Sequence, residues 1–120
     1  MTTTLYQRLG GAEGIARIVD DFVAAHLENP IIKTRFDNVK DMEHAKQMAR
    51  EFFCAGAGGP ESYTGKDMLT AHKGMNISEQ EYMAAIDDIV GAMNKYKVDQ
   101  GSINEVVGIL YSLKGNIIRV

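Results

Sequence analysis

The chain has 120 residues, of which 45% are hydrophobic and 24% are charged. This length fits one domain spanning residues 1–120, and the composition excludes wholesale disorder. The formal net charge of −3, with no basic stripe, argues against nucleic acid as a partner. No apolar run is long enough for a membrane span, no signal peptide is visible, and the single Cys54 excludes an intrachain disulfide. We therefore expect a cytoplasmic protein.

Apolar residues recur at helical spacing in the first half of the chain, and glycines separate the periodic segments. A short helix is expected before Gly10-Gly11, and a long one over residues 15–27. Asn29-Pro30 should stop that helix and begin a short one, with Asn29 as its cap and Pro30 at its first position. The apolar period then repeats over residues 41–57.

The second half contains two further periodic segments. Ser78 and Glu81 form a capping box that opens a helix running to about Met93. A final helix is expected from about Asp99, with Ile117 facing inward. No stretch alternates with a period of two residues, so the fold class is all-α.

Residues 58–77 do not fit a plain helical bundle. Four glycines and one proline leave room only for a brief helix over residues 67–72. A loop of this length in a compact domain is usually functional or disordered. Tyr63, Met68 and Leu69 make the segment too apolar for a disordered linker. A large, flat cofactor packed against this loop would explain its composition.

His72 is the strongest candidate for a cofactor ligand. No Cys-x-x-Cys or His-Glu-x-x-His motif indicates a zinc site, and no phosphate-binding glycine motif is present. Four phenylalanines and several methionines could line a haem pocket, in which a histidine is the commonest ligand. Periodicity alone favours an ordinary core for these aromatic residues and a solvated or capping role for His72. Two other residues have structural interpretations: His26 as a helix-end histidine and Cys54 as a small buried hydrophobe.

Several motifs, in the right order over nearly the whole chain, resemble those of the group I truncated haemoglobins, which are two-over-two helical globins. The motifs are Leu5-Tyr6-Gln7-Arg8-Leu9-Gly10-Gly11, Asp21-Phe22, Phe36, Glu51-Phe52-Phe53, Gly58-Gly59-Pro60-Glu61-Ser62-Tyr63-Thr64-Gly65 and Met68-Leu69-Thr70-Ala71-His72-Lys73. The stretch from Gly58 to His72 is specific, whereas the first glycine pair alone would be weak. The resemblance implies a truncated globin-like, two-over-two helical sandwich around haem b (iron protoporphyrin IX) that serves oxygen binding or oxygen transport.

The resemblance also assigns residues to the haem. His72 would be the proximal iron ligand through Nε2, while its Nδ1–H donates to a nearby carbonyl. Phe36 matches the phenylalanine that stacks on the porphyrin, and Lys73 or Arg50 would pair with a propionate. The remaining haem-contact positions are Phe22, Phe52, Phe53, Tyr63 and Met68, with Ile77, Ile86, Ile109 and Leu113 as weaker candidates.

The distal side departs from the family pattern. Where the family commonly has a tyrosine that hydrogen-bonds the bound gas, this chain has Val23. Positions that often carry glutamine or leucine are Ala45 and Ala49. The loss of these donors should speed oxygen release and weaken nitric oxide dioxygenation. Met48 or His44 is an alternative sixth iron ligand; otherwise Met48 lines the pocket and His44 is a surface residue.

Reversible binding of oxygen, nitric oxide or carbon monoxide is thus the expected function. The alternatives are a nitric oxide dioxygenase or peroxidase-like haem enzyme, a six-coordinate redox, electron-transfer or sensor protein, and a haem-free helical sensor. The apolar distal side disfavours the enzyme, because oxygen activation needs a polar donor near the ligand. The expected partners are the diatomic gas and a reductase, and the expected state is a monomer or weak dimer.

Overall fold

The computed structural model describes residues 3–120. The described residues form a helical domain without β-strands, in which Ile77 and Ile118 make one isolated parallel bridge. The helices are α1 (Leu5–Arg8), α2 (Gly11–Glu28), the 3₁₀-helix η1 (Lys33–Phe36), α3 (Met42–Gly56), α4 (Met68–His72), α5 (Glu79–Lys95), α6 (Gln100–Ser112) and the 3₁₀-helix η2 (Lys114–Asn116).

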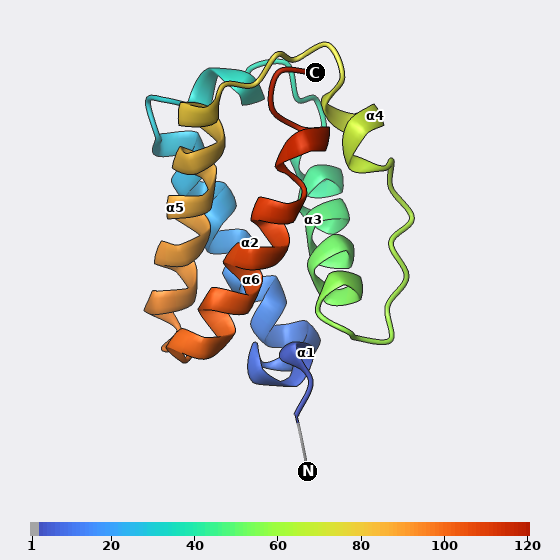
Figure 1. Ribbon diagram of the computed structural model, residues 1–120, viewed down its shortest axis with the longest axis vertical. Coiled ribbons are helices and arrows are strands. Elements are labelled where there is room, and N and C mark those ends of the chain that lie inside the picture. Colours follow the sequence, from blue (N-terminus) through green and yellow to red (C-terminus); the bar gives the residue numbers. More distant parts are fainter. Residues whose placement is uncertain (1–2) are drawn as a thin grey trace.

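The four long helices form two packed pairs around one core. Helix α2 packs against both α3 and α5, and α5 also contacts α6. Figure 1 shows α5 and α6 in front of α2, with α3 beside them and the loop leading to α4 on the outer side of α3. The most deeply buried side chains come from α2, α5 and α6 and include Ile15, Ile18, Val19 and Met93. This two-over-two arrangement confirms the fold class predicted from the sequence.

Two glycines bring α1 and α2 together at a sharp corner. Gly10 has φ = +97°, a left-handed conformation that glycine adopts without steric cost. Gly14 lies so close to the carbonyl group of Leu9 that no Cβ atom fits between them. As a result, α2 begins at Gly11, four residues before the apolar stripe that marks it in the sequence.

The prediction that Asn29-Pro30 begins a helix is wrong. Helix α2 does end before Asn29, but the next helix, η1, begins at Lys33 and has Ile32 at its cap position. The side-chain oxygen of Asn29 accepts a hydrogen bond from the Ile31 N–H at 3.0 Å, which closes a turn instead of a helix start.

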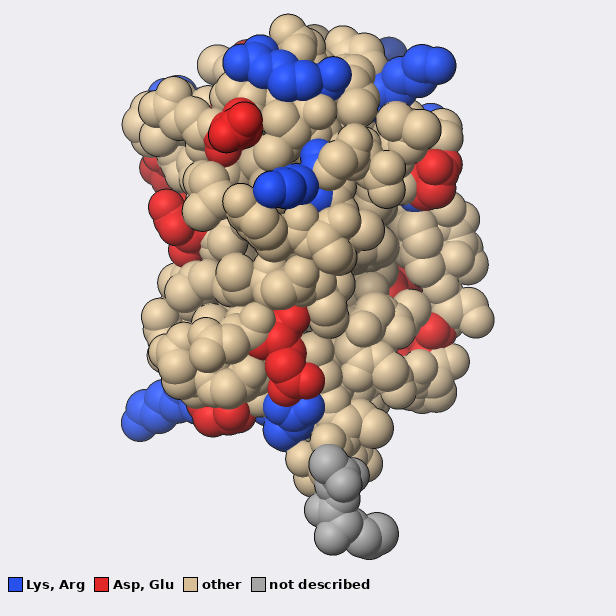
Figure 2. All heavy atoms as spheres, viewed as in Figure 1, with Lys and Arg blue, Asp and Glu red and all other residues tan. Residues whose placement is uncertain are grey.

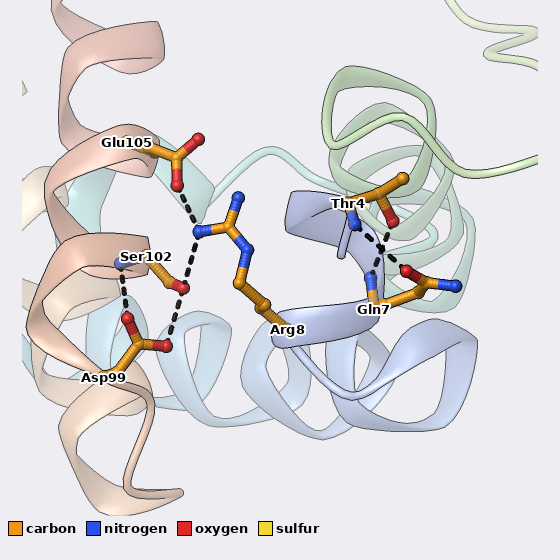
Figure 3. A network of polar contacts seen from close by, with 6 residues as sticks. All are labelled: Thr4, Gln7, Arg8, Asp99, Ser102 and Glu105. Carbon is orange, nitrogen blue, oxygen red and sulfur yellow. Dashed lines mark hydrogen bonds and ion pairs between the residues drawn. The ribbon is translucent and has the colours of Figure 1, made fainter. Parts of the chain in front are cut away.

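The later helix starts lie where the sequence places them. Ser78 and Glu81 form the predicted reciprocal capping box, and the Asp99 carboxylate caps α6 by accepting from the Ser102 N–H at 3.0 Å. Arg8 of α1 donates to the Ser102 hydroxyl at 3.0 Å and pairs with Glu105 (Figure 3). This network therefore joins α1 to α6. Among residues 3–120, we find no helix with the length and hydrophobicity of a membrane span.

Candidate functional site

An open cavity of about 780 Å³ lies at the end of the molecule where η1, α4 and the C-terminal segment meet (upper end in Figure 1). Small-molecule sites are usually concave and mostly apolar, with a few polar groups. Most of its lining is apolar, and it contains two histidines. The lining residues are His26, Ile32, Arg35, Phe36, Val39, His72, Met75, Ile77, Glu81, Tyr82, Ala85 and Ile117.

A second hollow, of about 1310 Å³, adjoins the first along α3. The two share Val39, and the consecutive residues Ala71 and His72 of α4 each line one of them. Together they border α4 on both sides. The second hollow is lined by Val39, His44, Ala45, Met48, Tyr63, Thr64, Gly65, Lys66 and Ala71.

His72 is held in one tautomer at the end of α4. Its Nδ1 atom lies 2.8 Å from the Met68 carbonyl oxygen, which can only accept, so Nδ1 carries the proton. Within the described residues, Nε2 makes no hydrogen bond, and its lone pair remains available. A ring nitrogen fixed by a carbonyl while the other is free is the usual arrangement of a metal-ligating histidine.

The C-terminal segment holds the loop that follows His72. The Val120 carbonyl oxygen accepts from the Gly74 N–H at 3.2 Å and the Asn76 N–H at 3.1 Å. The Arg119 N–H donates to the Ile77 carbonyl oxygen at 2.9 Å. These bonds place Ile77 in the wall of the first cavity beside the buried Ile117.

Arg35 and Glu81 close one side of the first cavity with a bidentate ion pair. Arg35 Nη2 donates to Glu81 Oε1 at 2.9 Å, Nε pairs with Oε2, and Nη1 donates to the Met75 carbonyl oxygen at 2.8 Å. The hydrogen bonds from Arg35 and from the Ser78 backbone lower the pKa of Glu81 to about 2. The pair therefore links η1, the loop after α4 and the start of α5 while both groups are charged.

His26 is a wall residue of the first cavity rather than a simple helix-end histidine. Its side chain is only 7% exposed, and its Nδ1–H donates to the Asp88 carboxylate at 2.8 Å. Burial lowers the pKa of His26, and the hydrogen bond and charge of Asp88 oppose that shift. Its sequence position gave no signal of this role, because Asp88 lies 62 residues later on α5.

The distal candidates Val23, Ala45, Met48 and Ala49 carry no hydrogen-bond donor in their side chains. Ala45 and Met48 line the second hollow, Ala49 is half-buried against the core, and Val23 is 7% exposed within the core. His44 lines the same hollow from an exposed position.

Two polar groups of the second hollow are already engaged, whereas the His44 imidazole and the Lys66 ammonium group, which also line it, form no side-chain hydrogen bond or ion pair within residues 3–120. The Tyr63 hydroxyl donates to the Lys66 carbonyl oxygen at 2.6 Å, and the Thr64 hydroxyl donates to Glu51 at 2.7 Å. The hollow therefore combines methyl, thioether and aliphatic groups with the polar side chains of His44 and Lys66.

The aromatic candidates divide between separate regions. Phe36 lines the first cavity and Tyr63 the second hollow, whereas Phe52 and Phe53 line a small apolar cavity together with Ile109. Phe22 is buried, with its ring centroid 5.3 Å from that of Phe53 and 5.3 Å from that of His26.

The remaining candidates do not line either of the two openings. Ile86 is buried in the core, and Met68 and Leu113 are partly buried against it. Arg50 forms ion pairs with Asp20 and Glu43, which occupy its guanidinium outside the cavities. Lys73 is exposed beside His72 and forms no ion pair within the described part of the chain.

Two helical pairs, a five-residue helix ending in an oriented histidine and an adjoining apolar cavity define a truncated globin. The sequence profile described as "Bacterial-like globin" matches residues 4–119. The group 1 truncated hemoglobin of Tetrahymena pyriformis is 32% identical over 107 residues, covering 89% of this chain and 88% of that protein. That of Mycolicibacterium paratuberculosis is 27% identical over 114 residues, covering 95% and 83%.

Solved structures agree with these relatives. The truncated hemoglobin of T. pyriformis in its Fe(III) form superposes with a TM-score of 0.94 at 29% identity, covering 98% of this chain and all of that one. The 2/2 hemoglobin of Synechococcus, with covalently attached heme, gives a TM-score of 0.85 at 27% identity, covering 95% of each chain. The chain belongs to the bacterial-like globins and, within them, to the group 1 truncated haemoglobins.

Proposed function

We propose that this truncated haemoglobin holds haem b beside His72 and reversibly binds oxygen, nitric oxide or carbon monoxide. The orientation of His72 carries the proposal: Nδ1–H is bonded to the Met68 carbonyl oxygen, and Nε2 is free at an apolar cavity. When bound, the haem would supply an iron that can bind a diatomic gas. Family membership supports both the cofactor and the class of ligand.

The chain's own residues orient the cofactor and exclude water from it. Phe36 lines the cavity with its ring and is suited to lie against the porphyrin. Met75, Ile77 and Ile117 line the same cavity as His72 and supply apolar surface there. An apolar lining of this kind lowers the local dielectric constant around an axial histidine.

The apolar distal side favours reversible binding over an oxygen-activating enzyme. Val23, Ala45 and Ala49 have no polar atom to donate to a bound gas. A nitric oxide dioxygenase or a peroxidase-like enzyme would need such a donor, so it is the weaker candidate.

The second candidate function is a six-coordinate haem protein for electron transfer or sensing. Met48 favours it, because its thioether lines the second hollow on α3. His44 lines the same hollow and is the other candidate ligand.

Uncompensated positive charge near the cavities supports a reductase with an acidic surface as the partner. Among the described residues, six cations on the segments at this end form no ion pair: Lys33, Lys40, Lys66, Lys73, Lys114 and Arg119. Figure 2 shows Lys and Arg side chains spread over the same end of the molecule. This charge would attract an acidic partner in a chain that is acidic overall.

A His72→Gly variant tests the function directly. The wild-type protein, expressed with haem supplied, should show a Soret band and an iron–histidine vibration in the ferrous form. The variant should lose that vibration and most of its haem, and added imidazole should restore binding. A wild-type chain without a Soret band, or a variant that keeps the normal iron–histidine vibration, would contradict the proposal.

A further inference from the structure

His26 connects the first cavity to the partly buried carboxylate of Asp88. Its ring lies between two phenylalanines, with centroid distances of 5.3 Å to Phe22 and 5.8 Å to Phe36. The rings of His26 and Phe36 are nearly parallel, with an interplanar angle of 21°. Because the Asp88 carboxylate can only accept, the 2.8 Å contact fixes the proton on Nδ1 and the plane of the imidazole.

Asp88 also fixes the turn that leads to Phe36. The Asn29 amide donates to both carboxylate oxygens of Asp88, at 3.2 and 3.4 Å. The Asn29 carbonyl oxygen in turn accepts from the N–H groups of Ile32 at 3.1 Å and Lys33 at 2.8 Å. One side chain on α5 therefore holds the end of α2, the turn and the start of η1.

Phe36 needs such support because its own segment is short. It is the last residue of η1, a four-residue 3₁₀-helix whose hydrogen-bond geometry is weak, and its ring is half-buried. In the described part of the chain, His26 is the aromatic side chain stacked on it. The orientation of Phe36 therefore depends on a ring whose own plane is set from α5.

We propose that His26 is a positioning residue: held by Asp88, it sets the orientation of Phe36 against the porphyrin and thereby slows haem loss. This inference rests on the proposed haem function. Its alternative is a histidine that fills space in the core without acting through Phe36. The two roles differ in whether the effect of a His26 substitution on the rate of haem loss depends on Phe36.

A double-mutant cycle separates these roles. The rate of haem transfer to excess apomyoglobin is measured for the wild type, His26→Gln, Phe36→Leu and the double variant. His26→Gln should speed transfer about tenfold in the wild-type background and less than about twofold in the Phe36→Leu background. Additive effects of the two substitutions on the transfer rate would overturn the proposal.

One further variant guards against a purely structural explanation. Ser102→Ala removes a buried hydrogen-bonded hydroxyl at the other end of the fold, near α1, and is the matched control. It should lower the urea midpoint of the haem-free protein without changing the transfer rate more than about twofold. Equal acceleration by Ser102→Ala would contradict positioning by His26.

If His26→Gln does not fold, Asp88→Asn takes its place in the cycle. Asp88→Asn keeps the shape of the Asp88 side chain and removes the charged acceptor of the His26 hydrogen bond. It should speed transfer about threefold in the wild-type background and have no effect beside Phe36→Leu. Absence of a Soret band in the wild type would instead contradict the proposed function itself, so the two failures are distinguishable.

Discussion

The carboxylate of Glu51 on α3 accepts two hydrogen bonds from Thr64, one from its hydroxyl at 2.7 Å and one from its backbone N–H at 2.9 Å. These bonds tie the long loop before α4 to the helix that borders the second hollow. They also lower the pKa of Glu51, with the Thr64 hydroxyl as the largest cause. Loss of this hydrogen bonding should free the loop that lines the second hollow.

Thr64→Val should weaken this tie in a pH-dependent way. Because the pKa of Glu51 is lower in the folded than in the unfolded state, its contribution to stability is present above the unfolded pKa. It is lost as the pH falls through the folded pKa. The urea midpoint of Thr64→Val should therefore lie below that of the wild type at pH 7, and the difference should shrink toward pH 3.

Ser62→Ala is the control for that experiment, because Ser62 is an exposed residue of the same loop with no side-chain hydrogen bond in the described structure. It should leave the urea midpoint unchanged at both pH values. A constant difference between Thr64→Val and the wild type from pH 7 to pH 3 would argue against a role for the ionised carboxylate.

Gly59→Ala should destabilise the fold by about 1–3 kcal/mol, as overpacking of a tight contact does. A Cβ atom at Gly59 would overlap the ring of Tyr6 and approach the carbonyl oxygen of Cys54. Gly56→Ala is the matched control, because its Cβ would meet no other atom and would favour the last turn of α3 by about 0.5–1 kcal/mol. Urea unfolding of both variants measures the difference, and equal midpoints would refute the close approach.

Ala45→Gln should slow oxygen dissociation from the ferrous protein. An amide at this position lines the second hollow and can donate to the bound gas, a hydrogen bond of about 1 kcal/mol that corresponds to roughly fivefold in rate. Ala45→Leu fills similar space without a donor and serves as the control. Stopped-flow displacement of oxygen by carbon monoxide gives the rates, and equal slowing by both variants would indicate a steric effect instead.

Met48→Leu should convert a six-coordinate ferrous spectrum into a five-coordinate one if the thioether is the sixth ligand. His44→Gln is the parallel variant, since both side chains line the same hollow. We expect the simpler result, in which the wild type is already five-coordinate and neither substitution changes the visible bands. Sharp, split visible bands in the wild type that disappear in one variant would identify that residue and favour the electron-transfer candidate.

The sequence predicted those parts of the fold that depend on local interactions. The capping box of Ser78 and Glu81 involves residues three apart, so its pattern is visible in the chain, and α6 begins next to Asp99, where the sequence predicts it. Asn29 has the same local signature as a cap, but its side chain turns to the Ile31 N–H and to Asp88. Local propensity was overridden there by a partner on another helix.

The candidate site likewise contains some contacts that the sequence could predict and others that depend on how distant helices pack. Both Met68 and His72 belong to α4, so the carbonyl that orients the imidazole could be expected from the sequence. The position of His26 in the cavity wall could not, because it depends on how α2 and α5 pack. Phe52 and Phe53 match haem-contact positions by motif, yet side-chain direction on α3 brings them to a separate apolar cavity.

The hydrogen bonds from Gly74 and Asn76 to the carbonyl oxygen of Val120 also determine where a fusion partner can be attached to this protein. Any polypeptide fused after Val120 would emerge directly beside the loop that follows His72. Helix α1 lies at the opposite end of the molecule, away from both hollows (Figure 1). Affinity tags, fluorescent reporters and surface linkers are therefore best attached ahead of α1, where they leave the two hollows unobstructed.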